Sequence, residues 1–483
     1  MAFSHIKQQI RDALRDRSIA SLALAVAKDG EIIWEDGFGW ANRERQVRSN
    51  PHIAYSLASI SKPVTATALM TLVEQGNIDL DAPINAYLSD AKVTAHVGVA
   101  LDGQAGLDPK EAADKATVRM VANHTSGLPL HYHFFHEDEP WRRPPMDLSI
   151  ARYGHLVRFP GERYVYANFG YGLLDYIIER VSGVPFATYL KREVFDPLGM
   201  THASVGIGQH LAPYTAERYD QNGHPISFYD FDHPGASAVY CSPHDLIRFA
   251  MQHLKTSWID QRPILSDASV DEMQTPTSEG DSPDGYGIGW RITSDNHGYR
   301  TVNHDGSMGG VRTRLMFVPE ERLAVAVMCN ASNELPVEIA DTVMAECLPD
   351  FAPSAEMIDN NALNKKMTFV LNSALSGLWK GRIHTYNGDL PIEITLSDQD
   401  TPTVRIGDGH RAVLEDITFE DDLLTGLSVG DIETEDASKR PYTLAFDLSL
   451  RWNVLNGSVS AISKPAAKLG NALSHWCELE KAS

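Results

Sequence analysis

The chain has few of the features that mark disulfide-rich, zinc-binding and nucleic-acid-binding proteins. It holds four cysteines in 483 residues. No two of them form a Cys-x-x-Cys pair, so the spacing of a zinc site is missing. Lysine and arginine number 42 against 64 acidic residues, which gives a net charge of −22. Such a surface repels phosphate backbones and anionic lipid, so we expect no nucleic-acid partner. A well-hydrated surface explains this charge; attraction of cationic substrates is the alternative.

Long apolar runs and a leader pattern are also missing. No stretch approaches the roughly 20 apolar residues that a membrane-spanning helix requires. The N-terminus begins Met1-Ala2-Phe3 and continues as a charged amphipathic stretch. It lacks the basic region, apolar run and cleavage site of a signal peptide. The sequence therefore predicts a cytoplasmic protein without a membrane partner, and the low cysteine count is consistent with a reducing compartment.

Hydrophobic residues make up 43% of the chain, which is enough for a large core. Short apolar runs on either side of Asp29-Gly30 predict a β-hairpin. A helix is predicted over 60–75, with Gly76-Asn77 as its stop signal. Further helices are expected near 171–182, 185–194 and 243–254, and further strands at 286–293, 300–304, 312–318 and 322–329. Strands from both ends of this region predict one antiparallel sheet flanked by helices, an α/β fold of the α+β type.

The composition and the hydrophobic pattern of the sequence change near residue 351. A polar stretch over 351–366 is typical of a linker. After it, eight short strand-like runs are separated by turn residues, and this pattern predicts an antiparallel β-barrel. Hairpins are expected at Asn387-Gly388, Asp408-Gly409 and Asn456-Gly457, and the barrel core is expected to hold Trp379, Trp452 and Trp476. The predicted domains are therefore 1–350, a linker 351–366, and 367–483.

The first pattern that indicates chemistry is Ser59-Ile60-Ser61-Lys62. Ser59 lies where the predicted helix begins, so free backbone N–H groups and the helix dipole favour negative charge there. Lys62 follows one turn later on the same face. A desolvated lysine can lose its proton and act as a base. Alone, the pattern is equally explained by a capping serine followed by a surface lysine.

Two further patterns become informative in combination with the first. In Tyr166-Ala167-Asn168, a tyrosine beside a lysine can act as a base and the asparagine can hold a substrate amide; a stacked aromatic patch is the alternative. In His304-Asp305-Gly306, the glycine allows a substrate to lie along a strand edge. The N–H groups of Ser307 and Ser59 could then form an oxyanion hole. The alternative for this pattern is a glycine-rich turn with an incidental histidine.

The three patterns, in this order, resemble the class C β-lactamase, D-aminopeptidase and carboxylesterase group of the penicillin-binding superfamily. Three further sequence segments agree with this resemblance, which covers about residues 10–348. These segments are Asn123-His124-Thr125-Ser126-Gly127-Leu128-Pro129, Asn168-Phe169-Gly170-Tyr171-Gly172-Leu173-Leu174 and Pro197-Leu198-Gly199-Met200. The tail is similar to the lipocalin-like modules appended to some peptidases of this group. That module could hold a ligand, gate the site, mediate oligomerisation or simply add stability.

The resemblance implies acyl-enzyme catalysis without a metal or other cofactor. Ser59 attacks a carbonyl, and Lys62 and Tyr166 move its proton to the leaving group. Asn168 and His304 position the substrate and the proton network. His304 replaces the lysine with which β-lactamases of this group usually begin the third motif. A neutral histidine holds a carboxylate less well, so a D-aminopeptidase-like peptidase is favoured. Asp305 could pair with a substrate ammonium or be a solvated turn residue.

His131, His133 and His136 precede the acidic run 137–139. A metal site is one interpretation of this pattern. We favour a loop beside the active site, in which Phe134, Phe135 and Trp141 contact substrate.

The expected partner is a small peptide or ester substrate, and assembly of several copies is left open. A carboxylesterase, a class C-type β-lactamase or an acyltransferase could use the same residues. A protein that binds without turnover is the non-enzymatic alternative, and the presence of all three motifs argues against it.

Overall fold

The computed structural model describes residues 3–96, 108–277, 285–353, 373–397, 400–463 and 470–482. The chain divides into two units. The first unit consists of Met1–Ala82, Phe135–Arg142 and Gly170–Asp359, and the second consists of Pro83–Phe134, Arg143–Phe169 and Asn360–Ser483. Most of the predicted linker lies outside the described residues, so the boundary placed at 351–366 stays a prediction. No helix among the described residues is both long and apolar enough to cross a membrane.

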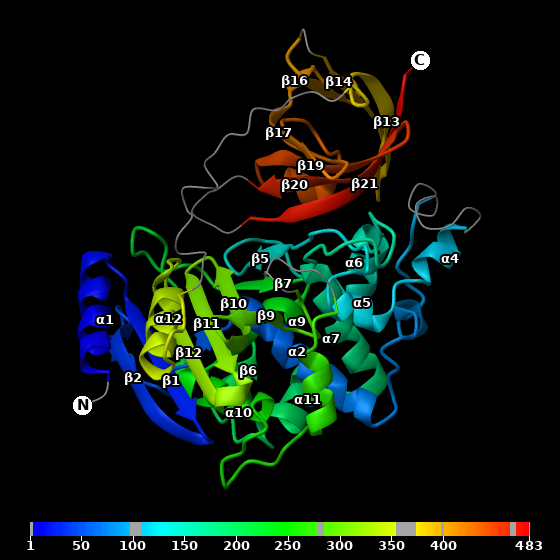
Figure 1. The fold of residues 1–483 in the computed structure, drawn as a ribbon. Coiled ribbons are helices and arrows are strands. Elements are labelled where there is room, and N and C mark those ends of the chain that lie inside the picture. Colours follow the sequence, from blue (N-terminus) through cyan, green and yellow to red (C-terminus); the bar gives the residue numbers. More distant parts are fainter. Residues whose placement is uncertain are drawn as a thin grey trace. The chain divides into compact units, whose positions relative to one another are not determined.

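A seven-stranded antiparallel sheet forms the centre of the first unit, in the order β3-β2-β1-β12-β11-β10-β9 (Figure 1). Early and late strands of this unit meet where β1 pairs with β12, for example Leu22 with Cys329. The predicted single antiparallel sheet is therefore confirmed. Its strands are β1 Ser21–Lys28, β2 Glu31–Asn42, β3 Val47–Arg48, β9 Arg291–Asn296, β10 Tyr299–Met308, β11 Val311–Val318 and β12 Leu323–Cys329.

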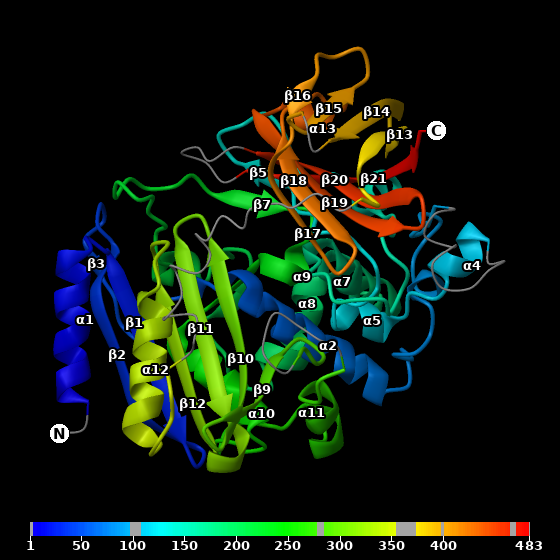
Figure 2. The same cartoon turned by 45° about the horizontal axis from the view of Figure 1, so that its top comes forward.

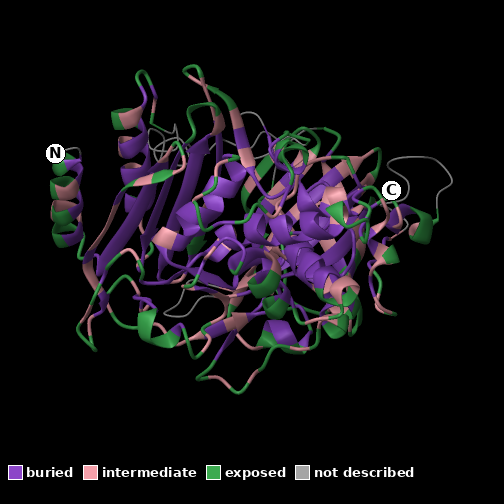
Figure 3. Ribbon diagram, turned by 90° about the horizontal axis from the view of Figure 1, so that it is seen from below, coloured by how far each residue is buried: buried purple, intermediate pink, exposed green. Residues whose placement is uncertain are grey.

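Helices cover both faces of this sheet (Figure 2). The apolar residues Leu22, Leu24 and Val26 of β1 share one core with α1 (Ser4–Asp16) and α12 (Leu335–Cys347). The intervening residues of β1 are alanines, which point to the opposite face. Their small side chains let α10 (Pro243–His253) pack closely on β1 and β12. The central strands are accordingly buried on both faces (Figure 3).

The helix that follows the proposed nucleophile is α2, Ser61–Glu74, and its residues from Ser61 to Leu72 are all buried. The predicted strand 286–293 begins and ends later than expected, because Gly287 N donates to Trp290 O in a turn and β9 spans Arg291–Asn296. The other elements of the first unit are β4 Tyr55–Ser56, η1 Ala58–Ile60, α8 Phe186–Leu190, η3 Lys191–Phe195, β6 Ala203–Val205, η4 Ala212–Tyr214, β7 Tyr229–Phe231, α9 Pro234–Ser237, β8 Val239–Cys241, α11 Asp267–Met273 and η5 Pro319–Glu321. β5 (Phe134–His136) and α7 (Asn168–Ser182) have residues in both units.

The second unit contains a nine-stranded antiparallel sheet in the order β16-β15-β14-β13-β21-β20-β19-β18-β17. Its two edge strands, β16 (Ala412–Val413) and β17 (Glu415–Glu420), are separated in sequence by Leu414 alone. The sheet therefore curls back on itself into a nearly closed barrel, as predicted. The other strands are β13 Gly377–Thr385, β14 Gly388–Leu396, β15 Thr403–Ile406, β18 Leu423–Ser428, β19 Tyr442–Arg451, β20 Val454–Ser463 and β21 Ala472–Lys481. The helices of this unit among the described residues are η2 Ile84–Ala86, α4 Pro109–Ala113, α5 Val118–Ala122, α6 Met146–Tyr153 and α13 Glu435–Ser438.

The sheet has nine strands in place of the predicted eight, because Leu414 separates β16 from β17, and two further predictions for the barrel are wrong. Asn456-Gly457 lies inside β20, and the hairpin turn is Trp452-Asn453, since Arg451 pairs with Val454. A β-carbon on Gly457 would lie 2.1 Å from Asp447 O, so this glycine serves a close strand approach. Trp452 is 88% exposed in the turn, whereas Trp379 and Trp476 are buried as predicted.

Histidines are concentrated where β21 and β13 meet the earlier segments of the second unit. The ring of His96 stacks on that of Trp476 at 5.2 Å between centroids and lies 4.7 Å from that of His384. His475 is fully buried, and neither of its ring nitrogens has a hydrogen-bond partner in the described part of the chain. Burial lowers the pKa of His96 to about 4 and that of His475 to about 3, and it holds the pKa of His155 well below its usual value.

We expect the second unit to lose stability as the pH falls below about 6.5, the ordinary pKa of histidine. His96, His155 and His475 stay neutral when folded but take up protons when unfolded, so acid favours the unfolded chain. Each contributes a slope of about 1.4 kcal/mol per pH unit until its folded pKa is reached. Urea unfolding followed by tryptophan fluorescence between pH 7.5 and 5 measures this slope. In His475→Leu the slope should fall by about a third; an unchanged slope would contradict the assignment.

Candidate active site

Ser59 lies in η1, one turn of 3₁₀-helix that leads directly into α2. The residue before it, Ala58, is buried and has φ of 49°, a left-handed conformation that is costly for a residue with a β-carbon. The surrounding structure has to hold this conformation. Pro63 occupies the first turn of α2, where its missing N–H costs no hydrogen bond. The start of the helix is therefore where the sequence predicts it.

Hydrogen bonds hold the segment around Ser59 to two neighbouring parts of the first unit. Thr313 Oγ1 on β11 donates to Leu57 O at 3.0 Å. Leu57 N donates to Val239 O on β8 at 2.8 Å, and Val239 N donates in turn to Ser61 Oγ at 3.0 Å. These bonds attach both ends of the turn that carries Ser59. The hydroxyl is thereby positioned by backbone and buried side-chain contacts.

Lys62 has no exposed surface, and its Nζ lies 3.2 Å from Ser59 Oγ. The same amine donates to Ala236 O at 3.3 Å. Burial, together with the charge of Arg291, holds the pKa of Lys62 well below its usual value. A neutral amine carries a lone pair that can accept the serine proton, so the pair has the composition and spacing of a nucleophile and its base.

His304 on β10 is fully buried, with both ring nitrogens hydrogen-bonded. Nδ1 lies 2.7 Å from Asp305 O, which can only accept, so Nδ1 carries the proton. Nε2 then accepts from Tyr286 OH at 3.0 Å. Burial, followed by the charge of Arg291, holds the pKa of His304 well below its usual value. His304 is therefore a neutral, fixed imidazole.

The side chain of Asp305 points to the face of β10 opposite to that of His304, where its carboxylate contacts two arginines. Its carboxylate accepts from Arg314 at 2.7 Å and lies 3.9 Å from Arg312. Burial would raise the pKa of Asp305, but Arg314, Arg312 and Arg291 outweigh it and keep the pKa below its usual value. The carboxylate is therefore ionised and already compensated. The role as a partner for a substrate ammonium stays a prediction.

Gly306 lies against the segment that carries Ser59. A β-carbon at this position would lie 2.0 Å from Leu57 O, 2.2 Å from Thr313 Oγ1 and 3.1 Å from Ala58 Cβ. Only glycine permits this approach. Ser307 follows as an exposed residue of β10. The role of its N–H in an oxyanion hole stays a prediction.

Tyr166 and Asn168 belong to the second unit, whereas Ser59, Lys62 and His304 belong to the first. Within the second unit, His124 holds the segment of Tyr166. Its Nδ1 accepts from Ala167 N at 3.2 Å, its carbonyl accepts from Val165 N at 2.8 Å, and its ring lies 4.5 Å from that of Tyr166. In the sequence, His124 is recognisable only as part of the segment Asn123–Pro129. The catalytic roles of Tyr166 and Asn168 stay predictions.

The histidines of the predicted loop are buried in different surroundings. His131 packs on Tyr153 with 4.3 Å between ring centroids, and His136 packs near Tyr229 at 5.2 Å. Phe134 and Phe135 are also buried, and Phe134 begins strand β5. The expectation that this segment contacts substrate stays a prediction.

The hydrogen bond from Tyr286 gives a testable result. In Tyr286→Phe, Nε2 of His304 becomes a buried acceptor without its donor, which costs about 1–3 kcal/mol of unfolding free energy. Urea unfolding measures the loss. Tyr214→Phe, at a half-exposed tyrosine, is the control and should change stability by less than about 0.5 kcal/mol. Equal stability of Tyr286→Phe and the wild type would show that the hydrogen bond contributes nothing.

The model of the family described as Beta-lactamase matches residues 6–346. The Bacillus subtilis (strain 168) protein named PbpX is 28% identical over 330 residues, covering 68% of this chain and 74% of that protein. Penicillin-binding protein 4* of the same organism is 25% identical, covering 70% of this chain and 74% of that protein. The chain spans 62% of protein flp of Staphylococcus aureus (strain MRSA252).

Solved structures share the fold. The octameric penicillin-binding protein homologue from Pyrococcus abyssi has a TM-score of 0.62 and 22% identity, and the match covers 99% of this chain and 100% of that chain. A class C β-lactamase has a TM-score of 0.57 and 19% identity, and the match covers 71% of this chain and 97% of that chain. At this level of identity the likeness concerns the fold, and in the first case it extends over the tail.

Proposed function

Because this chain belongs to the Beta-lactamase family of serine hydrolases, we propose that it forms an acyl-enzyme at Ser59 and cleaves peptide-like amide bonds. The observation that carries the proposal is the pair formed by Ser59 and Lys62. The lysine is completely buried, its pKa is depressed, and its amine lies 3.2 Å from the serine oxygen. A structural lysine is usually exposed at its charged end, because burying an ammonium is costly.

The proposed reaction has two halves. Ser59 Oγ attacks the carbonyl carbon, its proton passes to Nζ of Lys62, and the C–N bond breaks as the leaving amine takes up a proton. Water then attacks the acyl-enzyme and releases the acid and the free serine. Tyr166 is proposed to share the proton transfer, the N–H groups of Ser59 and Ser307 to bind the oxyanion, and Asn168 to hold the substrate amide.

The third motif supports a peptidase of the D-aminopeptidase type. His304 is neutral, fully buried and bonded at both nitrogens. It therefore offers no positive charge to a substrate carboxylate, which carboxypeptidases and β-lactamases must hold. A structural neighbour, SurE, has been solved with D-Leu, which agrees with a D-configured substrate residue. The barrel is proposed to be a lipocalin-like module on this hydrolase.

Two alternatives use the same residues. A structural neighbour from Pseudomonas syringae is described as a β-lactamase/D-alanine carboxypeptidase, and this favours β-lactam or ester hydrolysis as the second candidate. An acyltransferase would need an amine to replace water in the second half of the reaction. Assembly into an oligomer is a further proposal, which the octameric neighbour supports.

Covalent labelling tests the nucleophile. The full chain, treated with a fluorophosphonate and analysed by intact-mass and peptide mass spectrometry, should gain one adduct on Ser59. Ser59→Ala should gain none. Ser257→Ala removes an exposed serine and should label like the wild type. An adduct absent from the wild type, or retained in Ser59→Ala, would overturn the assignment.

Relative substrate turnover tests the reaction type. We expect a higher kcat/KM for D-Ala-p-nitroanilide than for nitrocefin or short p-nitrophenyl esters. A preference for nitrocefin or esters would favour the second candidate. Transfer of the acyl group to an added amine, in place of hydrolysis, would favour the acyltransferase.

A further inference from the structure

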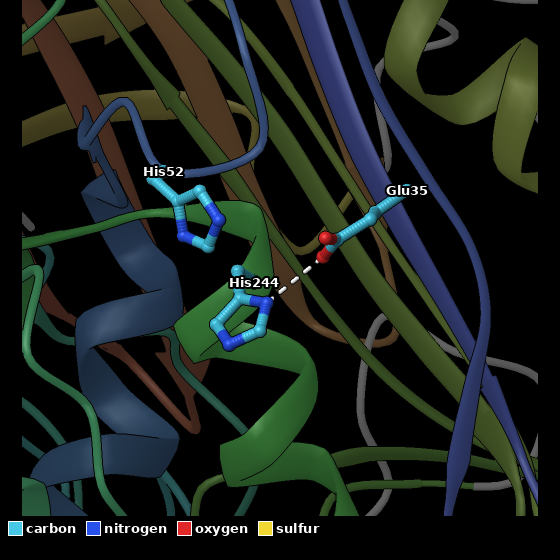
Figure 4. Close-up of side chains that lie close together, drawn as sticks. All are labelled: Glu35, His52 and His244. Carbon is cyan, nitrogen blue, oxygen red and sulfur yellow. Dashed lines mark hydrogen bonds and ion pairs between the residues drawn. The ribbon is translucent and has the colours of Figure 1, made fainter.

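A group of three metal-ligating side chains lies in the first unit, separate from the Ser59–Lys62 pair. Glu35 comes from β2, His52 from the loop between β3 and β4, and His244 from the first turn of α10. Their ligand atoms all lie within 4.8 Å of one another. Figure 4 shows the three side chains converging from these separate segments.

The fold brings these residues together for identifiable reasons. On β2, Trp34 packs into the core shared with α1 and α12, so Glu35 points to the opposite face, on which α10 packs. His244 lies near the start of α10, and its Nδ1 is 2.8 Å from Glu35 Oε2. The ring centroid of His52 lies 4.6 Å from that of His244.

The position of His52 is not accounted for by hydrogen bonds of its ring. It is exposed, and its ring nitrogens form no hydrogen bond with the described residues. They remain available as ligands beside a carboxylate–imidazole pair that is already formed. Two histidines and one carboxylate are a donor set that zinc prefers, with the fourth position open to water.

We propose that Glu35, His52 and His244 bind a divalent transition-metal ion of the zinc class. Tetrahedral zinc, with ligands at about 2.0–2.1 Å, places its ligand atoms roughly 3.3 Å apart. The widest separation in the group must therefore shorten by at most about 1.5 Å. A side-chain rotation of exposed His52 can supply this movement. The bound ion would tie the loop of His52 to β2 and α10.

Zinc titration of the full chain by calorimetry tests this proposal, with ZnCl₂ as the probe. The wild type should bind one equivalent, and its Tm should rise with zinc concentration, because a ligand that binds only the folded state stabilises it. Mg²⁺ and Ca²⁺, which prefer oxygen ligands, should bind at least tenfold more weakly. In His52→Gln the zinc Kd should rise at least tenfold.

The matched control is His5→Gln. His5 is also an exposed histidine beside a carboxylate, 3.6 Å from Glu346, but no second histidine forms a ligand group with it among the described residues. This variant should bind zinc as the wild type does. The ring of His52 makes no hydrogen bond to any described residue that His52→Gln could break, so that variant should fold and keep the Tm of the zinc-free wild type. No zinc binding by the wild type, or equal binding by His52→Gln, would overturn the proposal.

Discussion

Lys62→Met should abolish most of the hydrolytic activity while leaving the protein at least as stable as the wild type. A positioned general base contributes typically about 10²–10⁴-fold to a rate, so we expect the rate of acylation of Ser59 to fall by about that factor. The free energy of unfolding should stay the same or rise. The folded-state pKa of Lys62 lies well below its usual value, so burial disfavours the ammonium in the folded chain but not in the unfolded chain. Methionine removes this cost.

A reduced rate of acylation in a variant that keeps its stability would show that Lys62 acts in catalysis and is not needed for folding. Stopped-flow acylation by a fluorophosphonate measures the first, and urea unfolding at pH 7 measures the second. Lys62→Arg should be both inactive and destabilised, because the guanidinium stays charged in the same buried position. Lys255→Met, at a partly exposed lysine paired with Asp271, should retain wild-type activity. Full activity in Lys62→Met would refute the role of this amine as the base.

Gly306→Ala should impair catalysis without touching a reacting group. The added β-carbon would lie 2.0 Å from Leu57 O and 2.2 Å from Thr313 Oγ1, and neither a backbone carbonyl nor a buried threonine can easily give way. The turn before Ser59 must shift. A displacement of about 1 Å can cost roughly 10²-fold in rate, and overpacking of this kind costs typically about 1–3 kcal/mol of stability.

Steady-state kinetics with a p-nitrophenyl ester and urea unfolding measure these two effects. Gly208→Ala is the matched control, because its β-carbon would meet only the ring of His210, at 3.1 Å, and that side chain can rotate away. It should retain activity and stability. If Gly306→Ala kept the wild-type kcat, the close packing of β10 on the nucleophile segment would have no catalytic importance.

The sequence predicted the parts of this protein that depend on local rules. The start of α2 between Ser59 and Lys62 follows from helix-terminus chemistry, and the sheet shared by early and late strands follows from short apolar runs. Trp452 was misplaced because burial was assigned from residue type, whereas the turn at Trp452-Asn453 depends on strand register.

Contacts between residues distant in sequence explain the other omissions. Tyr286 donates to His304 across 18 positions, and His124 supports Ala167 across 43. Glu35, His52 and His244 are too far apart in the sequence to form a recognisable metal-binding motif. The packing of α10 against the sheet brings them together. The spacing of His131, His133 and His136 is compatible with a metal site, yet His131 packs against Tyr153 and His136 packs near Tyr229.

The attachment of the turn at Ser59 to β8 and β11 has a consequence for inhibitor design. The serine oxygen is carried by a segment that is hydrogen-bonded to β8 and β11 at Leu57 and to β8 at Ser61, and these bonds oppose its displacement when different acyl groups approach. An electrophilic warhead that matches this fixed geometry should react with comparable ease whatever scaffold carries it. Selectivity for this enzyme must then be built into the remainder of the compound, in the groups that replace the substrate's side chains.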